Sequence, residues 1–313
     1  MKNKNAARLE QPHSKAIHNT LIVVLFMAAG LPLAHPAQAA NKSTRISSVP
    51  YTIEEPGSYV LTQDLECAGT AIEILASEVD LNLGGHTLTG EGWGVGVHVQ
   101  RQADVRIHQG TVQGFENGVL FEGAFNSSLD NVTATENNWG IAGRANSIGL
   151  TLTHNTANHN YGTGIMFDSW SRGITVAHNT ANQNGGIGLL VGGGALAVSL
   201  NGNTANGNGW AGIDLGSTSA NDVTDNTANY NGDRGIILEG ASNNTVTRNT
   251  TELNILGISL EWGATGNTLK GNKAGDNRDA DLLENNPPGP SCLNTWMNNT
   301  FESFGGAAAD CIQ

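Results

Sequence analysis

A short asparagine-containing sequence recurs along this chain at an almost constant spacing. The leading asparagines of its copies follow one another at steps of 23 or 24 residues, and Asn131 is expected to extend the column one coil upstream. A second asparagine column, from Asn137 to Asn277, has nearly the same period. The copies are HNTANHN from His154, HNTANQN from His178, GNTANGN from Gly202, DNTANYN from Asp225, RNTTELN from Arg248 and GNKAGDN from Gly271. A fixed period of this length indicates units that stack on one another.

Each repeat also contains two short alternating segments. A Gly-aliphatic-x-aliphatic stretch follows the asparagines, as in Gly164-Ile165-Met166-Phe167, and a second apolar pair precedes them, as in Val198 and Leu200. Such alternation is typical of short strands with one buried face. A leucine-rich repeat would show a different leucine pattern, and a propeller would have a longer period. The sequence therefore predicts an all-β protein, a single-stranded parallel β-helix.

The period also predicts how the chain is divided. We expect a solenoid of about nine coils, with about 22–24 residues per coil, over residues 79–286. Residues 41–78 are expected to form an N-terminal cap and first coil, and residues 287–313 a C-terminal cap. The asparagines are expected to occupy tight turns, where their side-chain amides stack as ladders along the rod.

The N-terminus has the pattern of an export signal. Basic residues, among them Lys2 and Arg8, precede an apolar run over 21–33 that leads to Ala37-Gln38-Ala39. This order is typical of a signal peptide that is cleaved after a small-x-small site. We therefore expect residues 1–40 to be a signal peptide and the mature chain to be secreted or periplasmic, without a membrane anchor.

The mature chain would be strongly acidic. Removing residues 1–40 takes away four of the 15 basic and one of the 28 acidic side chains, leaving 11 against 27 and a net charge of −16. Nucleic acids and anionic membranes are bound largely by Lys and Arg, so this charge argues against both as partners. An acidic polysaccharide would need a bridging cation or a local basic pocket.

Three cysteines lie in the part expected to be exported. Cys292 and Cys311 are close together near the C-terminus and are expected to form a disulfide in an oxidising compartment. Cys67 is then left over and is expected to be a buried free thiol near the N-terminal end of the core, with a reactive role as the alternative.

These motifs resemble a known group of proteins. The NTANxN boxes followed by Gly-Ile look like the repeats of right-handed parallel β-helix proteins, both pectate-lyase-like and NosD-like. The segment EEPGSYVLTQDLECAGTAIEILASEVDLNLGGHTLTG from Glu54 and the closing string CLNTWMNNTFESFGGAAADC from Cys292 are similar to the ends of such exported proteins. The resemblance implies the fold and leaves the function open among lyases, hydrolases, epimerases, binding proteins and scaffolds. An Asp-Pro-His motif, expected of alginate epimerases, does not occur.

Outward residues that share a column in neighbouring coils are candidates for function. Asp130, His154 and His178 precede the leading asparagines of consecutive coils. Two imidazoles and a carboxylate are a recognised set of ligands for a divalent transition metal. The alternative is an exposed turn position, because the same column continues with Gly202, Asp225 and Arg248.

A second column follows the Gly-Ile strand and contains Glu122, Arg144 and Asp168. Asp214 should also point outward, within two coils of Asp168. As a catalytic or sugar-binding patch, these carboxylates would act as acid or base and Arg144 would stabilise a charged intermediate. The alternative is a surface ion-pair ladder that contributes little to stability.

Several aromatic residues lie at or beside the expected loops. Their faces could stack on sugar rings, or they could pack against the rod and cover its core. The aromatic residues are Trp139, Tyr161, Trp170, Trp210 and Trp262.

Together these features predict a secreted or periplasmic β-helix protein that recognises a polysaccharide on its lateral face. Any enzymatic activity would be of the lyase, hydrolase or epimerase kind. Two alternatives stay open: a NosD-like accessory protein that handles a metal ion, and a structural or adhesive surface protein. The sequence leaves the oligomeric state open.

Overall fold

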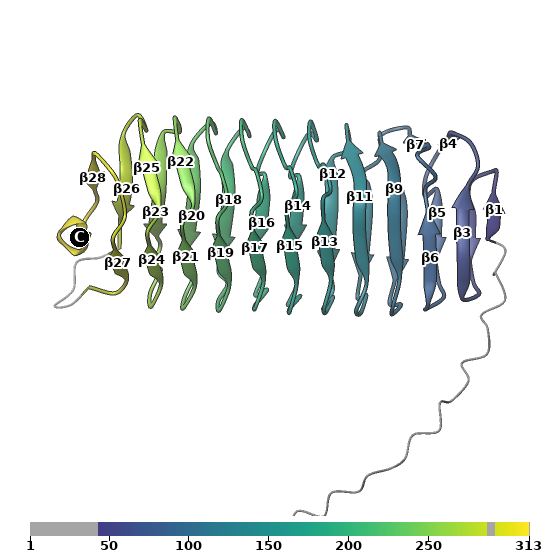
Figure 1. Ribbon diagram of the computed structural model, residues 1–313, viewed down its shortest axis with the longest axis horizontal. Coiled ribbons are helices and arrows are strands. Elements are labelled where there is room, and N and C mark those ends of the chain that lie inside the picture. Colours follow the sequence, from purple (N-terminus) through teal and green to yellow (C-terminus); the bar gives the residue numbers. More distant parts are fainter. Residues whose placement is uncertain (1–42, 287–291, 313) are drawn as a thin grey trace, which may run out of the picture. The chain divides into compact units, whose positions relative to one another are not determined.

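A computed structural model describes residues 43–286 and 292–312 of the chain. The expected signal peptide, and residues 287–291 of the expected C-terminal cap, lie outside this part. The described residues form a right-handed parallel β-solenoid, in which the chain winds repeatedly through the same strand positions (Figure 1). No helix in the described ranges is long and apolar enough to cross a membrane.

Two long sheets run the length of the solenoid, and neighbouring strands pair in parallel. The path of the first sheet is, in order, β1 (Thr44–Ile46), β3 (Gly57–Leu61), β6 (Val79–Asn82), β9 (Arg106–Gln113), β11 (Ser128–Thr135), β13 (Thr151–Thr153), β15 (Thr175–Ala177), β17 (Ser199–Asn201), β19 (Asp222–Thr224), β21 (Thr245–Thr247), β24 (Thr268–Lys270) and β27 (Thr295–Met297). The strands β4 (Leu65–Cys67) and β7 (Thr87–Gly90) pair beside this path.

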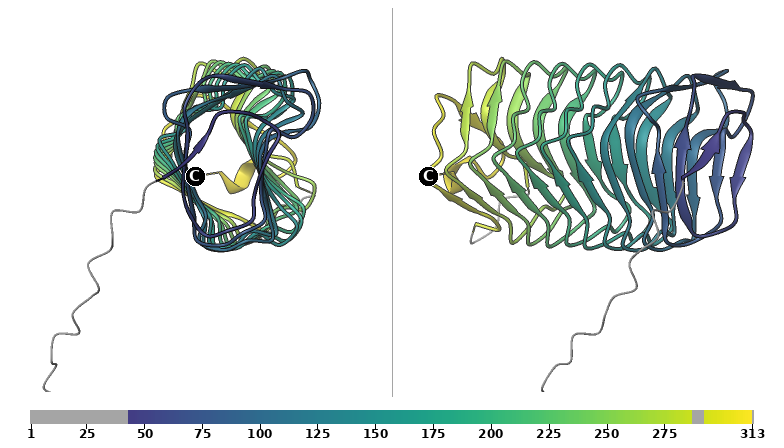
Figure 2. Two further views of the ribbon diagram at one scale, coloured as in Figure 1. Left: turned by 90° about the vertical axis from the view of Figure 1, so that its right-hand side faces the viewer. Right: turned by 45° about the vertical axis from the view of Figure 1, so that its right-hand side comes forward.

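The second sheet lies across the core from the first, as the end-on view shows (Figure 2). Its order is β2 (Tyr51–Ile53), β5 (Ile72–Ile74), β8 (Val95–Gln100), β10 (Asn117–Glu122), β12 (Trp139–Arg144), β14 (Ile165–Phe167), β16 (Leu189–Val191), β18 (Ala211–Gly216), β20 (Arg234–Glu239), β23 (Leu256–Glu261), β26 (Ala280–Glu284) and β28 (Phe304–Gly305). A small separate sheet joins β22 (Thr250–Glu252) to β25 (Lys273–Gly275).

The solenoid has about 11 turns, slightly more than the predicted nine, which match the nine strands on the main path of each long sheet within residues 79–286. The additional turns lie at the two ends, where β1–β3 and β2–β5 pair in parallel before the first repeat and β26–β28 after the last. These turns lack the asparagine box by which coils can be counted in the sequence. Backbone pairing therefore continues beyond the recognisable repeat.

Apolar side chains of equivalent strand positions stack inside the rod. In the second sheet, Phe121, Phe167 and Val191 occupy one such column, and each is at most 1% exposed. Leu152, Val176 and Leu200 form the matching column of the first sheet. Burial of these columns supplies the main stabilisation of a repeat fold, because a single coil has no partner of its own.

The predicted asparagine ladders are present at two turns. In the first, Asn203 Oδ1 accepts hydrogen bonds from the backbone N (2.9 Å) and Nδ2 (3.1 Å) of Asn179, and this pattern repeats from Asn155 to Asn299. The second ladder runs from Asn137 to Asn277 and ends on the carboxylate of Asp281. The amides thus satisfy buried backbone groups at the turns.

The expected place of Asn131 in the first ladder is wrong by one residue. Val132 occupies that position, since its backbone N–H donates to Asn155 Oδ1 at 3.0 Å. Asn131 is exposed and has a φ of 53°, as do the next residues of its true column, His154 at 55° and His178 at 57°. This column is therefore the left-handed turn position that precedes the buried ladder.

Two further ladders were not predicted. Asn221, Asn244, Asn267 and Asn294 form a buried ladder at the third turn. Another ladder is partly exposed and consists of Asn158, Asn182, Asn206 and Asn229. In it each Oδ1 accepts a hydrogen bond from the backbone N–H of the residue at the same position in the following coil. Their spacing of 23 or 24 residues, apart from the step of 27 from Asn267 to Asn294, was the available signal in the sequence.

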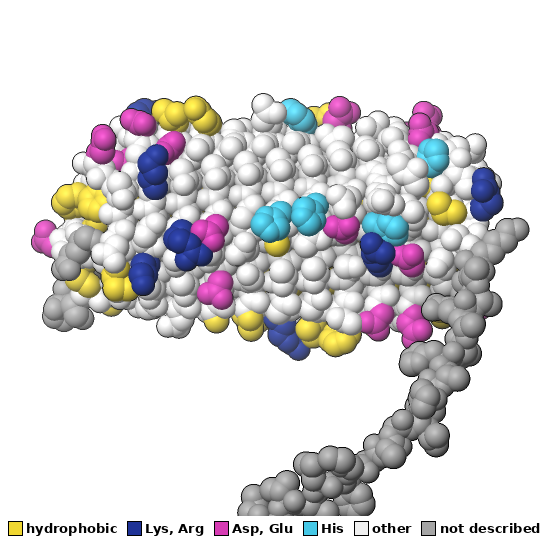
Figure 3. Space-filling model, viewed as in Figure 1, with side chains coloured by type: hydrophobic (Ala, Val, Ile, Leu, Met, Phe, Trp, Pro, Cys, Tyr) yellow, Lys and Arg dark blue, Asp and Glu magenta, His cyan; other side chains and the backbone are white. Residues whose placement is uncertain are grey.

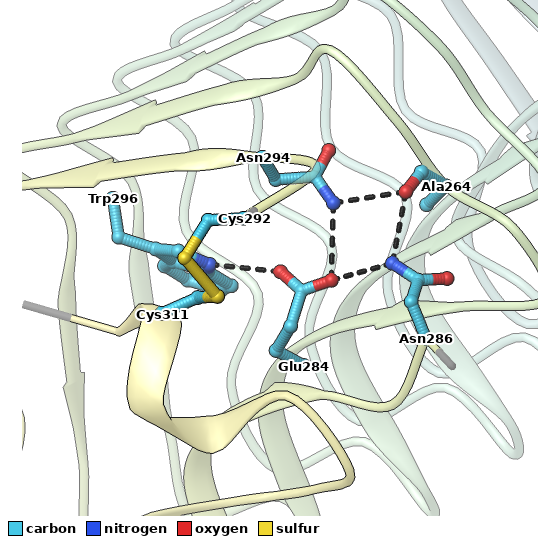
Figure 4. Close-up of a disulfide and its surroundings, with 7 residues drawn as sticks. All are labelled: Ala264, Glu284, Asn286, Cys292, Asn294, Trp296 and Cys311. Atoms are coloured by element: carbon cyan, nitrogen blue, oxygen red, sulfur yellow. Dashed lines mark hydrogen bonds between the residues drawn. A yellow bond between two sulfur atoms is a disulfide. The ribbon is translucent and has the colours of Figure 1, made fainter. Parts of the chain in front are cut away.

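The C-terminal end of the rod is closed by a disulfide-linked segment (Figure 4). The predicted Cys292–Cys311 disulfide is confirmed, and Cys67 is free and buried, with burial raising the pKa of its thiol. Beneath the disulfide, the Glu284 carboxylate accepts hydrogen bonds from Trp296 Nε1 at 2.9 Å and Asn294 Nδ2 at 3.0 Å. The 3₁₀ turn η1 (Ala309–Cys311) contacts β26, so this segment covers the last coil.

Candidate functional site

The outer face of the second sheet is buried at several positions where a solvent-facing strand would be exposed. Asp214 lies between Leu190 and Ile237 in one outward column, which continues to Ser259. Asp214 is 4%, Ile237 1% and Ser259 0% exposed. Side chains from the ends of the strands therefore fold over this face and cover it.

One cover comes from the two ends of β12. The guanidinium carbon of Arg144 lies 4.7 Å from the centre of the Trp139 ring, and Arg144 Nη2 is 3.0 Å from Met166 Sδ. Arg144 Nε also lies 3.6 Å from Asp168 Oδ2. This group, the N-terminal cover, shields Ala142 and Met166 in the outward column.

A second cover lies farther along the rod. Arg234, at the start of β20, donates to both carboxylate oxygens of Glu261, at the end of β23, at 3.0 and 3.3 Å. Asp233 accepts a third hydrogen bond from Arg234 and one from Trp210 Nε1. This C-terminal cover spans the outer face of β23 and explains why Ile237 and Ser259 are buried.

Between the two covers the surface is hollowed into a trough. Its volume is about 610 Å³, and Leu190, Gly192, Gly216 and Glu239 are among its lining residues. The carboxylate oxygen Oδ1 of Asp214 would lie 3.6 Å from a Cβ at Gly216, so Asp214 lies next to a lining residue without being one itself. Glycines at the ends of β16 and β18 keep the trough open where larger side chains would fill it.

An exposed tryptophan stands at each end of the trough. Trp262 lines it and is 76% exposed, and Trp170 lines the adjoining hollow and is 64% exposed. Gly194, with a φ of 77°, would place a Cβ 2.7 Å from the Trp170 ring, so the ring packs directly on that glycine. The turn of glycines therefore both positions Trp170 and leaves space in front of it.

Asp214 has the electrostatic properties of a proton-transfer group. Desolvation by burial, followed by the nearby charge of Glu239, raises its pKa to about 7, while Arg234 lowers it. Asp214 Oδ1 is buried and has no hydrogen-bond partner within the described part of the chain. A carboxyl group in this state can exchange a proton near neutral pH, and it retains an unused hydrogen-bonding atom for a ligand.

The predicted column of Glu122, Arg144 and Asp168 is in register, but its members do not form one continuous patch. Arg144 pairs with Asp168. Glu122 Oε2 instead lies 3.0 Å from His98 Nε2 in the preceding coil. Asp168 lines the trough and Asp214 lies next to its lining residue Gly216, while Glu122 is not among the lining residues.

The predicted aromatic residues are in different surroundings. Trp139 lies under Arg144, and Trp210 donates to Asp233, so both pack against the covers. Tyr161 is 77% exposed and is not among the trough's lining residues. Trp170 remains free to present its face beside the trough.

The predicted metal ligands lie on the other long face, over the first sheet. Asp130 is in register with Thr153 and not with His154, and the His154 and His178 rings stack with centres 5.7 Å apart. Figure 3 shows this mostly uncharged face, with histidine side chains lying side by side. Within residues 43–286 and 292–312, no three His, Cys, Asp or Glu side chains converge on a metal position. Asp130 Oδ1 nevertheless lies 3.4 Å from His154 Nδ1, so the three predicted ligands lie one after another along the face.

Arg234 and the trough itself were missed by the sequence reasoning. Arg234 acts through Glu261, a residue of the next coil, and nothing local to Arg234 indicates this contact. Glu239, Gly192 and Gly216 occupy the recognised column after the Gly-Ile strand, so their column was available from the repeat. The trough forms because Gly192 and Gly216 are the small residues in this column, and the repeat alone did not point to their effect on the surface.

Comparison with solved structures identifies the same fold in several proteins of known structure. The A-module of the Azotobacter vinelandii mannuronan C-5 epimerase AlgE4 superposes with a TM-score of 0.64, at 14% identity over 81% of this chain and 88% of that one. The Dettilon tailspike protein gives 0.72, at 18% identity over 85% and 61%. The periplasmic alginate epimerase AlgG gives 0.51, at 15% identity over 82% and 80%. These identities establish likeness of fold alone.

No curated protein sequence matches this chain. The model of the right-handed beta helix region matches residues 70–228 and 197–312, which together span most of the chain. Its strand order, stacked apolar columns and parallel pairing agree with that match. The chain therefore belongs to the right-handed beta helix family.

Proposed function

We propose that this protein is exported and binds a polysaccharide in the trough between Trp170 and Trp262, where Asp214 transfers a proton during processing of the bound chain. The observation that carries the proposal is the buried carboxyl of Asp214, whose Oδ1 is unpartnered within the described residues, beside an open trough. An unsatisfied polar group at a buried position is costly, so it is an expected feature of a site that a ligand completes.

The shape of the trough suits an extended sugar chain. The strands from β14, next to Trp170, to β23, next to Trp262, are consecutive in the second sheet. With about 4.8 Å between neighbouring parallel strands, the two rings are separated by roughly 19 Å along the rod. Exposed aromatic faces at both ends can stack on sugar rings, and glycine backbone between them lets the chain approach closely.

The chemistry of Asp214 supports processing in addition to binding. Hydrolysis, elimination and epimerisation of a sugar each require a group that gives or takes a proton near the working pH. The raised pKa of Asp214, about 7, meets this requirement. Named β-helix neighbours include a mannuronan epimerase and an alginate epimerase, and AlgG is named as periplasmic, which agrees with polysaccharide chemistry and export.

The test is a panel of polysaccharides incubated with the purified protein. New reducing ends would report hydrolysis, unsaturated products would report elimination, and deuterium incorporation from heavy water would report epimerisation. Asp214→Asn should lower the turnover by at least about 100-fold, because it removes the proton-transfer group. Asp222→Asn, which changes an exposed carboxylate on β19 of the other sheet, is the matched control.

The results separate the alternatives. Binding and turnover that are both lost or reduced by changes in the trough support the proposal. Turnover that is equal in Asp214→Asn and the wild type would contradict the role of Asp214. No binding and no turnover across the panel would favour a structural or adhesive protein.

A further inference from the structure

The trough is lined by negative charge. Asp168 and Glu239 line it and Asp214 lies next to the lining residue Gly216, whereas no Lys or Arg is among its lining residues. The net charge of the whole chain is −13. A ligand in this trough therefore meets carboxylates at the ends of β14 and β20, which are separated by β16 and β18 in the sheet.

The two nearby arginines belong to the covers and are not among the lining residues of the trough. Arg234 donates to both oxygens of Glu261 and also to Asp233. Arg144 lies against the face of Trp139 with its Nε 3.6 Å from Asp168 Oδ2, and this Nε has no hydrogen-bond partner within the described residues. No guanidinium therefore lines the trough to form the bidentate pair that an incoming carboxylate or sulfate group would require.

The charge of Glu239 already disfavours the charged form of Asp214. The coulombic contribution of Glu239 is the second cause of the raised pKa of Asp214, after burial. A third negative group placed between them would add repulsion in a partly desolvated site. Sugar hydroxyls, in contrast, can donate hydrogen bonds to these carboxylate oxygens.

We infer that the ligand of the trough is an uncharged polysaccharide, without carboxylate or sulfate groups, recognised by hydroxyl donation to Asp168, Asp214 and Glu239 and by stacking on Trp262. This inference rests on the proposed function, since it names the ligand of the same site. It separates this chain from the neighbours whose names refer to mannuronan and alginate, which are polyuronates. On this inference, the trough of this chain prefers an uncharged polymer, although the chain shares its fold with proteins named for polyuronates.

The experiment compares polymers that share a backbone and differ in charge. Suitable pairs are hydroxyethylcellulose with carboxymethylcellulose, and methyl-esterified with de-esterified polygalacturonate, alongside neutral glucans, mannans and xylans. Affinity electrophoresis of the full mature chain gives the dissociation constant for each polymer, with and without calcium. Within a bound pair, we expect the carboxylated member to bind at least about tenfold more weakly.

Variants connect the preference to the trough. Glu239→Gln should reduce the ratio of the dissociation constants of the carboxylated and the neutral polymer by about threefold or more, because it removes one repelling charge. Glu66→Gln changes an exposed carboxylate on β4, far from the trough, and should leave this ratio unchanged. Higher ionic strength should also reduce the ratio through screening.

The outcomes distinguish this inference from the proposed function. Binding that depends on Trp262 but is equal or tighter for carboxylated polymers, with or without calcium, would overturn the charge preference and leave the proposed site intact. Absence of binding to every polymer, or binding unaffected by Trp262→Ala, would overturn both. Trp262-dependent binding confined to neutral polymers supports both.

Discussion

Asp214 on β18 lies directly opposite Leu190 on β16, and the outward neighbour on its other side is Ile237 of β20. A carboxyl group between two aliphatic side chains loses hydration, and this burial is the largest cause of its raised pKa of about 7. The charged form is therefore disfavoured in the folded protein. Stability and chemistry at this residue should both depend on pH.

The first prediction concerns that pH dependence. Because the folded pKa lies above the unfolded value of about 3.9, the folded state binds more protons between roughly pH 4 and pH 7. Stability should thus fall as pH rises through this window, by at most about 4 kcal/mol from a shift of roughly three units. Asp214→Asn should raise the melting temperature at pH 8 relative to wild type and leave it nearly unchanged at pH 4.

Thermal unfolding of both proteins across this pH range checks the prediction. Asp222→Asn, at an exposed position, should follow the wild type at every pH. Parallel pH profiles of wild type and Asp214→Asn would show that the Asp214 carboxyl is not buried as described.

The second prediction concerns the buried ladder. Asn203→Ala removes the acceptor of two hydrogen bonds from Asn179, and the donors to Val176 O and Asn226 Oδ1. Leaving these buried groups unpaired should lower the free energy of unfolding by about 3 kcal/mol. Denaturant unfolding measures the change.

Asn206→Ala is the matched control for the ladder. Asn206 belongs to the partly exposed ladder, where its Oδ1 accepts one backbone N–H, from Asn229, and water can replace it. Asn206→Ala should therefore lower the free energy of unfolding by less than about 1 kcal/mol. Equal costs for the two substitutions would mean that burial does not set the value of the ladder.

The third prediction concerns the C-terminal segment. The Cys292–Cys311 disulfide joins residues 19 apart, and reducing it should lower stability by about 3 kcal/mol through the entropy of the opened loop. Trp296, which is 4% exposed below the disulfide, should then become hydrated, and its fluorescence should shift to longer wavelength. The shift should persist in Cys67→Ala, whose thiol takes no part in the disulfide. An unchanged spectrum on reduction would show that the segment is held without the disulfide.

The fourth prediction concerns the open volume of the trough. A Cβ at Gly192 would have its nearest neighbours at 3.5 and 3.7 Å, which are ordinary contacts, so a side chain fits there and projects into the trough. Gly192→Leu should therefore abolish polysaccharide binding while the melting temperature changes little. Gly275→Leu, at a position with open space on β25, is the control and should bind normally. Undiminished binding by Gly192→Leu would exclude the trough as the binding site.

The repeat could be predicted from the sequence because its cause is local. Each coil needs the same turn residues and the same apolar alternation, so Asn155, Asn179 and Asn203 recur at a fixed step. The first coils could not be counted in this way, because their turns use other residues, such as Gly84 and Gly85 with φ of 65° and 75°. The register error at Asn131 has a related cause, since Val132 replaces the asparagine in that coil.

The candidate site was harder to predict because it is made of differences between coils. Alternation with Ile213 and Leu215 indicates that Asp214 points outward, and it does. Its burial, however, requires the sheet neighbours Leu190 and Ile237 and the contacts of more distant side chains. Repeat periodicity shows which residues share a column, but it does not show which of them fold over the sheet.

The central claim is that the trough between Trp170 and Trp262 binds a polysaccharide. The most direct measurement is the dissociation constant of the best-bound polymer for Trp170→Ala and Trp262→Ala, with Trp93→Ala as control, because Trp93 is 56% exposed and is not among the trough's lining residues. Loss of a stacking face should weaken binding about tenfold in each trough variant and leave Trp93→Ala at the wild-type value. Equal affinities in all four proteins would contradict the account.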